Sequence, residues 1–107
     1  MWNSQAGGRL ERFMQPEDDF SRGMQTIERA IIEGVWNVGR HVTAADFTWH
    51  AGRVAPDTTH VDVRIGRRAV VGIFSREEIE DAADRVDRPE TLKTIERIIA
   101  EARQSRR

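Results

Sequence analysis

The first regular pattern in the chain is a long run of apolar residues at helical spacing. They recur every three or four positions: Phe20, Met24, Ile27, Ile31, Val35 and Val38. This period follows one face of an α-helix. Pro16 suits the first helical position and Gly39 suits the residue beyond the last turn, so we predict a helix over residues 16–38. An alternative interpretation ends the helix at Gly34 and leaves residues 35–42 extended.

Beyond residue 42 apolar residues alternate with polar ones, a pattern typical of half-buried strands. The alternation predicts strands over residues 45–50 and 59–65. A third strand, residues 69–74, is apolar on both faces, with the sequence Ala-Val-Val-Gly-Ile-Phe. We therefore expect this strand in the middle of the sheet, or covered on both sides.

The turn between the second and third strands leaves their register open. Gly66 favours a two-residue loop, which sets Val63 opposite Val70. A three-residue loop instead sets Val63 opposite Val71 and gathers the apolar residues on one face. The two signals conflict, so both registers are kept as alternatives.

The third strand leads directly into the start of a helix. Ser75 and Glu78 have the spacing of a capping box, and Phe74 and Ile79 have that of a hydrophobic staple. Proline disfavours helical geometry at the preceding residue, so we predict that this helix breaks just before Pro89. A last helix follows, with the predicted inner face Leu92, Ile95, Ile98, Ile99 and Ala102.

Together these elements predict an α+β fold: an N-terminal helix, a three-stranded antiparallel β-meander and two C-terminal helices. The chain has 107 residues, a length that suits one domain. We assign residues 16–103 to that domain, residues 1–15 to a flexible N-terminal arm, and residues 104–107 to a frayed tail.

The end of the third strand carries a short motif made of Ile73, Ser75, Arg76, Glu77, Ile79, Glu80 and Asp81. With this motif, the stretch from Arg67 to Gln104 resembles a family of small, uncharacterised proteobacterial α+β domains of unknown function. Members of that family have a β-hairpin, then a strand that runs into Ile-Ser-Arg-Glu-Ala-Leu-Glu-Asp, then a C-terminal helix. Phe74 departs from the family's Ile-Ser step. The resemblance covers about the last third of the chain and implies no activity.

Charge and composition exclude some classes of function. The formal net charge is −1, so no overall field draws the chain to nucleic acid or to an anionic membrane. The absence of cysteine excludes thiolate chemistry and a disulfide scaffold. No apolar run is long enough to span a bilayer, and the first residues lack the pattern of a secretory signal. We therefore expect a cytoplasmic protein without membrane contact.

Three histidines, His41, His50 and His60, fall in the middle third of the chain near Asp46 and Asp62. No pair has a metal-ligand spacing such as His-x-x-x-His, and strand alternation does not force the five residues together. We therefore predict no metal site. The chain also lacks a phosphate-binding glycine loop and a nucleophile with an adjacent base. Accordingly, we predict no catalytic residues, no cofactor and no enzymatic activity.

A group of basic residues surrounds the predicted hairpin. Arg64, Arg67 and Arg68 lie at its tip, and Phe47 and Trp49 lie on a neighbouring strand. An exposed sheet that carries arginines and aromatic rings binds single-stranded nucleic acid by stacking against its bases. The alternative interpretation places Phe47 and Trp49 in the core and the arginines in solvent, and we favour it.

We expect a small, non-catalytic bacterial domain for protein interaction or regulation, with an unidentified protein partner. Single-stranded nucleic-acid binding is the alternative function. A three-stranded sheet has two edges that can pair with a second copy. The strand over residues 59–65 carries Asp62 and Arg64, whose opposite charges attract across such a contact. Charges on an edge and the arginines at the hairpin tip oppose pairing, so a monomer is favoured over a homodimer.

Overall fold

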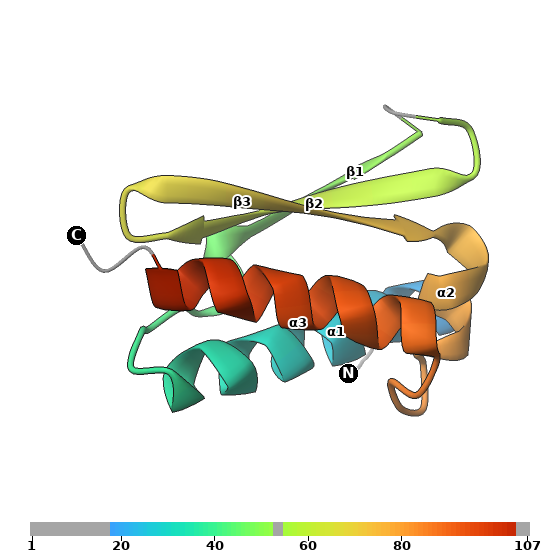
Figure 1. Cartoon of the computed structure of the whole chain (residues 1–107). Coiled ribbons are helices and arrows are strands. Elements are labelled where there is room, and N and C mark those ends of the chain that lie inside the picture. The colour runs from blue at the N-terminus through green and yellow to red at the C-terminus, as the bar shows by residue number, and fades with distance from the viewer. Residues whose placement is uncertain (1–17, 53–54, 105–107) are drawn as a thin grey trace, which may run out of the picture.

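The helices and the sheet form two layers in the computed structural model (Figure 1). The structure describes residues 18–52 and 55–104. In chain order the elements are α1 (Asp19–Asn37), the 3₁₀ helix η1 (Ala44–Asp46), β1 (Phe47–Ala51), β2 (Thr58–Ile65), β3 (Arg68–Ser75), α2 (Arg76–Asp81) and α3 (Pro89–Gln104). The predicted α+β class is confirmed, with three α-helices and one three-stranded antiparallel sheet among the described residues. The arm predicted over residues 1–15 lies outside the described residues. Of the tail predicted over residues 104–107, Gln104 is the last residue of α3, and residues 105–107 lie outside the described residues.

The two ends of α1 are set by local hydrogen bonds. The predicted start at Pro16 lies outside the described residues, but the helix begins only after Asp18, whose backbone is extended. The Ser21 N–H donates to the Asp18 carboxylate at 2.9 Å, and this bond lowers the pKa of Asp18. At the other end Gly39 has a φ of 85°, and the N–H groups of Gly39 and Arg40 donate to carbonyls of the last turn. This Schellman motif confirms the longer of the two predicted helices.

The sheet has the order β1–β2–β3 and is antiparallel throughout. The middle strand is therefore β2, and the prediction that placed residues 69–74 in the middle is wrong. Residues 59–65 are not an edge, so a second copy has no access to them for strand pairing. The Gly66–Arg67 turn, with a φ of 64° at Gly66, sets Val63 opposite Val70. Of the two registers, the one with the two-residue loop is thus correct.

The short helix η1 was not predicted and replaces the start of the strand expected over residues 45–50. The Thr43 N–H donates to Asp46 Oδ2 at 2.9 Å, and the Ala45 N–H donates to Thr43 Oγ1 at 3.3 Å. These bonds hold Ala45 and Asp46 in a helical turn, so the strand begins at Phe47.

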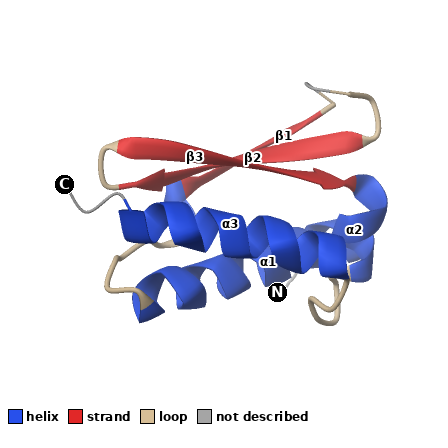
Figure 2. Ribbon diagram, in the orientation of Figure 1, coloured by secondary structure: helices blue, strands red, loops and turns tan. Residues whose placement is uncertain are grey.

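The core lies between the sheet and the helices, which cover one of its faces (Figure 2). The sheet contributes Phe47, Val61, Val63, Ile65, Val70 and Phe74. The helices contribute Ile27, Ile31 and Val35 from α1, Ile79 from α2, and Ile95, Ile98 and Ala102 from α3. Each fully buried valine, isoleucine or phenylalanine adds about 1.5–3 kcal/mol of stability. The contact between this sheet face and the helices is therefore the main source of stability.

Two glycines of α1 allow neighbouring helices to approach closely. A Cβ atom on Gly23 would overlap the backbone carbonyl of Ile79 in α2, and one on Gly34 would meet the Cδ1 atom of Ile99 in α3. A backbone carbonyl cannot move aside without shifting α2, whereas the end of an isoleucine side chain can rotate. Gly34 therefore interrupts the apolar face of α1 at a packing contact, and the helix continues through it.

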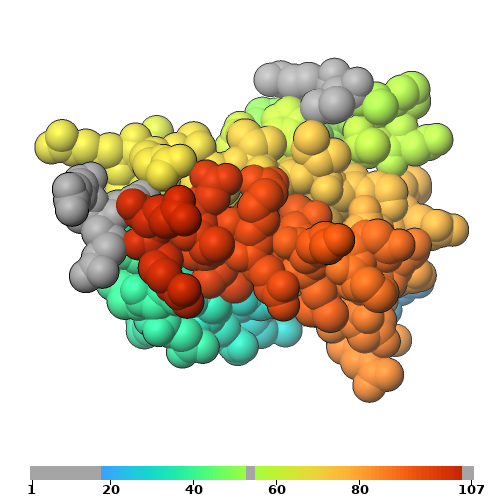
Figure 3. Space-filling view, in the orientation of Figure 1, coloured from blue at the N-terminus to red at the C-terminus, as the bar shows by residue number. Residues whose placement is uncertain are grey.

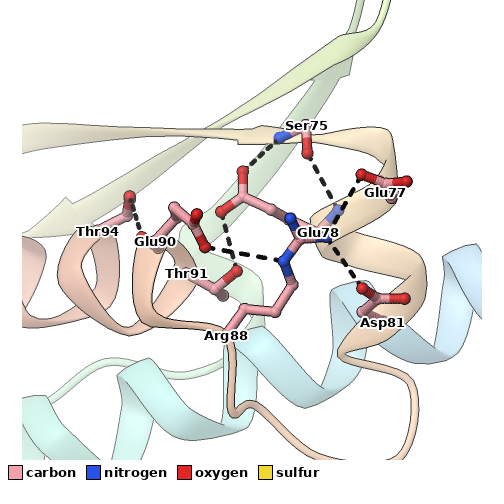
Figure 4. Close-up of polar contacts among 8 residues, drawn as sticks. All are labelled: Ser75, Glu77, Glu78, Asp81, Arg88, Glu90, Thr91 and Thr94. Carbon is pink, nitrogen blue, oxygen red and sulfur yellow. Dashed lines mark hydrogen bonds and ion pairs between the residues drawn. The ribbon is translucent and has the colours of Figure 1, made fainter.

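Glu78 connects the end of β3, the start of α2 and the first turn of α3 (Figure 4). The predicted capping box is present: the Glu78 N–H donates to Ser75 Oγ at 3.1 Å, and the Ser75 N–H donates to Glu78 Oε1 at 2.8 Å. The second carboxylate oxygen of Glu78 accepts a 2.9 Å hydrogen bond from Oγ1 of Thr91, which is buried. Thr91 thus occupies the inner face of α3, where Leu92 was predicted, and Leu92 is 39% exposed.

The helix α2 ends earlier than predicted. It stops at Asp81, and the chain reaches Pro89, the first residue of α3, through a loop. Arg88, the last residue of that loop, donates to Asp81 Oδ2 at 2.9 Å and lies 3.5 Å from a carboxylate oxygen of Glu77 (Figure 4). The hydrogen bond to Asp81 raises the pKa of Arg88. The acidic residues of α2 therefore hold the end of the loop against that helix through Arg88.

We predict that Gly23→Ala destabilises the fold. In an ordinary helix interior this change adds about 1 kcal/mol of stability. Here the new Cβ atom would overlap the Ile79 carbonyl, so the sign reverses. Gly34→Ala is the matched control and is expected to cost less, because only the end of the Ile99 side chain has to move. Urea denaturation measures both variants, and a stabilising Gly23→Ala would contradict the close approach of α1 and α2.

We predict that Ser75→Ala lowers the free energy of unfolding by about 1 kcal/mol, because it removes the acceptor for the Glu78 N–H. Ser21→Ala, inside α1, is the control. It is expected to be neutral or slightly stabilising, because alanine is the better helix former. Chemical denaturation gives the free energy of unfolding of both variants. An unchanged free energy of unfolding in Ser75→Ala would show that the start of α2 does not depend on this cap.

Candidate functional site

The face of the sheet opposite the described helices carries no second layer of described helices or strands (Figure 1). Alternate residues of each strand point to this outer face. They are Thr48 and His50 of β1, Thr58, His60, Asp62 and Arg64 of β2, and Ala69, Val71 and Ile73 of β3. The outer face therefore has a polar part over β1 and β2 and an apolar part on β3.

Strand register brings together His50, His60 and Asp62, which we call the His–Asp cluster. His50 of β1 is the direct partner of His60 on β2, and their imidazole rings stack with centroids 4.6 Å apart. Asp62 lies on the same face, two residues further along β2. Its Oδ2 atom is 3.4 Å from Nε2 of His50 and 4.0 Å from Nε2 of His60. One possible ligand atom from each residue lies within 4.8 Å of the others.

His60 is buried although it belongs to the outer face, and only 8% of it is exposed. Within the described part of the chain, its Nδ1 atom has no hydrogen-bond partner. Its Nε2 atom is 4.0 Å from Asp62, which is too far for a hydrogen bond. A buried polar group without a hydrogen bond costs about 1–3 kcal/mol. Core packing alone therefore does not account for a histidine at this position.

Two imidazoles and a carboxylate are the side chains that bind zinc and similar divalent metals. The prediction of no metal site depended on spacing along the chain, which is uninformative here because the ligand groups come from two strands. The missing information was the pairing of His50 with His60. The other two candidates do not belong to this group: the His41 ring packs against Trp36 with centroids 4.6 Å apart, and Asp46 belongs to η1, where it lines a hollow together with Asp62.

The apolar part of the outer face, which we call the β3 strip, consists of Ala69, Val71 and Ile73. Val71 is 41% exposed and Ile73 is 44% exposed. The helix α3 lies directly against β3 on the covered side (Figure 3). From there Arg97 reaches the edge of the strand, where its Nη2 atom donates to the Val71 carbonyl oxygen at 2.6 Å. A side chain of the same chain thus already binds one carbonyl of this edge strand.

The structure does not bring together the residues predicted for nucleic-acid binding. Phe47 and Trp49 point to the covered face, where Phe47 is buried and the Trp49 N–H donates to Glu28 Oε2 at 2.7 Å. Arg64 points to the outer face and Arg67 lies in the turn, while Arg68 pairs with Glu101 at 3.1 Å. The aromatic rings needed for base stacking are therefore separated from Arg64 by the sheet itself.

No family model matches the chain, and neither the curated proteins nor the solved structures include a match. Among the described residues, no helix is both long enough and apolar enough to cross a membrane.

We predict that single-stranded oligonucleotides do not quench the fluorescence of Trp49, because its ring lies on the covered face. The measurement uses a Trp2→Phe, Trp36→Phe variant, in which Trp49 is the only tryptophan. The titration is done at low salt, where phosphate contacts are strongest. Quenching that weakens as salt is added would contradict this placement and restore base stacking as a function.

Proposed function

We propose that this chain is a small, non-catalytic protein-interaction domain of the bacterial cytoplasm, and that it binds a protein partner through the outer face of its sheet. The observation that carries the proposal is the exposure of the β3 strip. Val71 and Ile73 are both more than 40% exposed on a face that the described helices leave free. Contiguous apolar residues with polar neighbours are typical of binding surfaces for other proteins.

The surroundings of the β3 strip support binding rather than catalysis. Across the sheet, Val71 lies opposite Asp62 and Ala69 lies opposite Arg64, so charged side chains border the apolar residues. Such a polar border sets the orientation of a partner while the apolar centre supplies contact area. Among the described residues, the titratable groups with shifted pKa values are Asp18, which caps α1, and Arg88, which binds acidic residues of α2. Their shifts therefore have structural causes.

We also propose that the domain is a monomer rather than a homodimer. The edge strand β3 is the place where a second sheet would add. Arg97 binds the Val71 carbonyl there, and Arg68 at the start of β3 carries a further positive charge. A contact through this edge would displace Arg97 from the Val71 carbonyl, and that loss opposes pairing.

The double variant Val71→Asn, Ile73→Asn is expected to lose partner binding, because it removes the apolar contact area and keeps the side chains similar in size. Leu92→Asn is the matched control, since Leu92 is exposed to a similar extent, 39%, but lies on α3. The assay is capture from a lysate of the native host, followed by mass spectrometry. Circular dichroism confirms that each variant is folded.

A protein captured by the wild type and by Leu92→Asn, but not by the double variant, supports the proposal. Equal capture by all three chains would exclude the outer face as the binding surface. Light scattering across a range of concentrations tests the oligomeric state separately. A mass that rises to twice 12.3 kDa would contradict the monomer.

A further inference from the structure

We propose that the His–Asp cluster is a binding site for a first-row divalent transition metal ion, with His50, His60 and Asp62 as its ligands. We compare the separations of the ligand atoms with those found around zinc. The proposal does not depend on the interaction function, because it uses different residues of the outer face. It replaces the expectation of no metal site that followed from the spacing of the histidines along the chain.

The separations of the ligand atoms fit a metal ion. Zinc bonds of about 2.0–2.2 Å at tetrahedral angles place two ligand atoms roughly 3.4 Å apart. The Oδ2 atom of Asp62 lies 3.4 Å from Nε2 of His50, and 4.0 Å from Nε2 of His60. These separations are close to those around one ion, and the two stacked imidazole rings would have to rotate for their Nε2 lone pairs to point at it.

The ligand groups are also chemically available. Among the described residues, no hydrogen bond is made by the side chains of His50 or His60, and Asp62 has only these two histidines as ion-pair partners. A histidine that serves a purely structural role normally donates or accepts at least one hydrogen bond when it is buried. His60 does neither among the described residues, so its Nε2 atom, 4.0 Å from Asp62 Oδ2, is available to a metal ion, and the ring proton would then sit on Nδ1.

The backbone holds the ligands in place before any ion binds. All three come from the paired strands β1 and β2, and His50 and His60 are direct partners across the ladder. Ligands on paired strands are positioned more accurately than ligands on loops. Three protein ligands leave one position of a tetrahedral ion for water or for a group from a partner. We assign no reaction to this position.

The first test follows the imidazole nitrogens directly. The full-length, untagged chain is labelled with ¹⁵N, and long-range proton–nitrogen NMR spectra are recorded while zinc is added. The signals of His50 and His60 are expected to shift together, with saturation at one ion per chain. The signals of His41, whose ring packs against Trp36 and which is not part of the cluster, are expected to stay unchanged. Spectra in which His50 and His60 do not respond would overturn the proposal.

The second test compares affinities by calorimetry. His50→Gln and Asp62→Asn each remove one ligand with little change in shape, whereas His41→Gln removes the histidine outside the cluster. Loss of an outer-shell partner weakens metal binding by roughly 10- to 100-fold, and loss of a ligand is expected to weaken it by more. His41→Gln is expected to keep the wild-type affinity. Wild-type zinc affinity in both ligand variants would overturn the proposal. If a variant does not fold, the NMR titration of the wild type decides alone.

Discussion

The pairing of β2 with β3 determines which side of the sheet every residue of these strands occupies. Because side chains alternate along a strand, a shift of one residue would turn Val61 and Val63 toward solvent and Asp62 toward the core. The two-residue turn at Gly66 and Arg67 prevents that shift by setting Val63 opposite Val70. The same pairing leaves the outer residues of β3 exposed. The core, the β3 strip and the position of Asp62 in the His–Asp cluster all depend on this register.

A second constraint is the number of helices available to cover the sheet. The long helices α1 and α3 lie side by side, and Gly34 of α1 lets Ile99 of α3 pack closely against it, so that both helices share one face of the sheet. With both helices on that face, the described chain has no helix left for the other. The exposed apolar residues of β3 and the cluster on β1 and β2 are consequences of this one-sided arrangement.

The features that were predictable from the sequence are those set by residues close together in the chain. The capping box joins Ser75 to Glu78, three positions away, and the apolar face of α1 repeats every three or four residues. The features that were missed depend on distant partners. The apolar outer half of β3 suggested a central strand, but the sequence does not show which faces the helices cover. The Thr91 side chain points into the core because its hydroxyl donates to the carboxylate of Glu78, which belongs to another helix.

Glu78 also has a consequence for how the domain opens. A helix of six residues such as α2 is too short to be stable in water by itself. Its first turn is tied to β3 through Ser75 and to α3 through Thr91, and both ties use the same carboxylate. The C-terminal end of β3 and the first turn of α3 are thereby coupled to α2. Local unfolding is then a cooperative event in which the three segments open together, and hydrogen exchange in α2 reports on the stability of the junction as a whole.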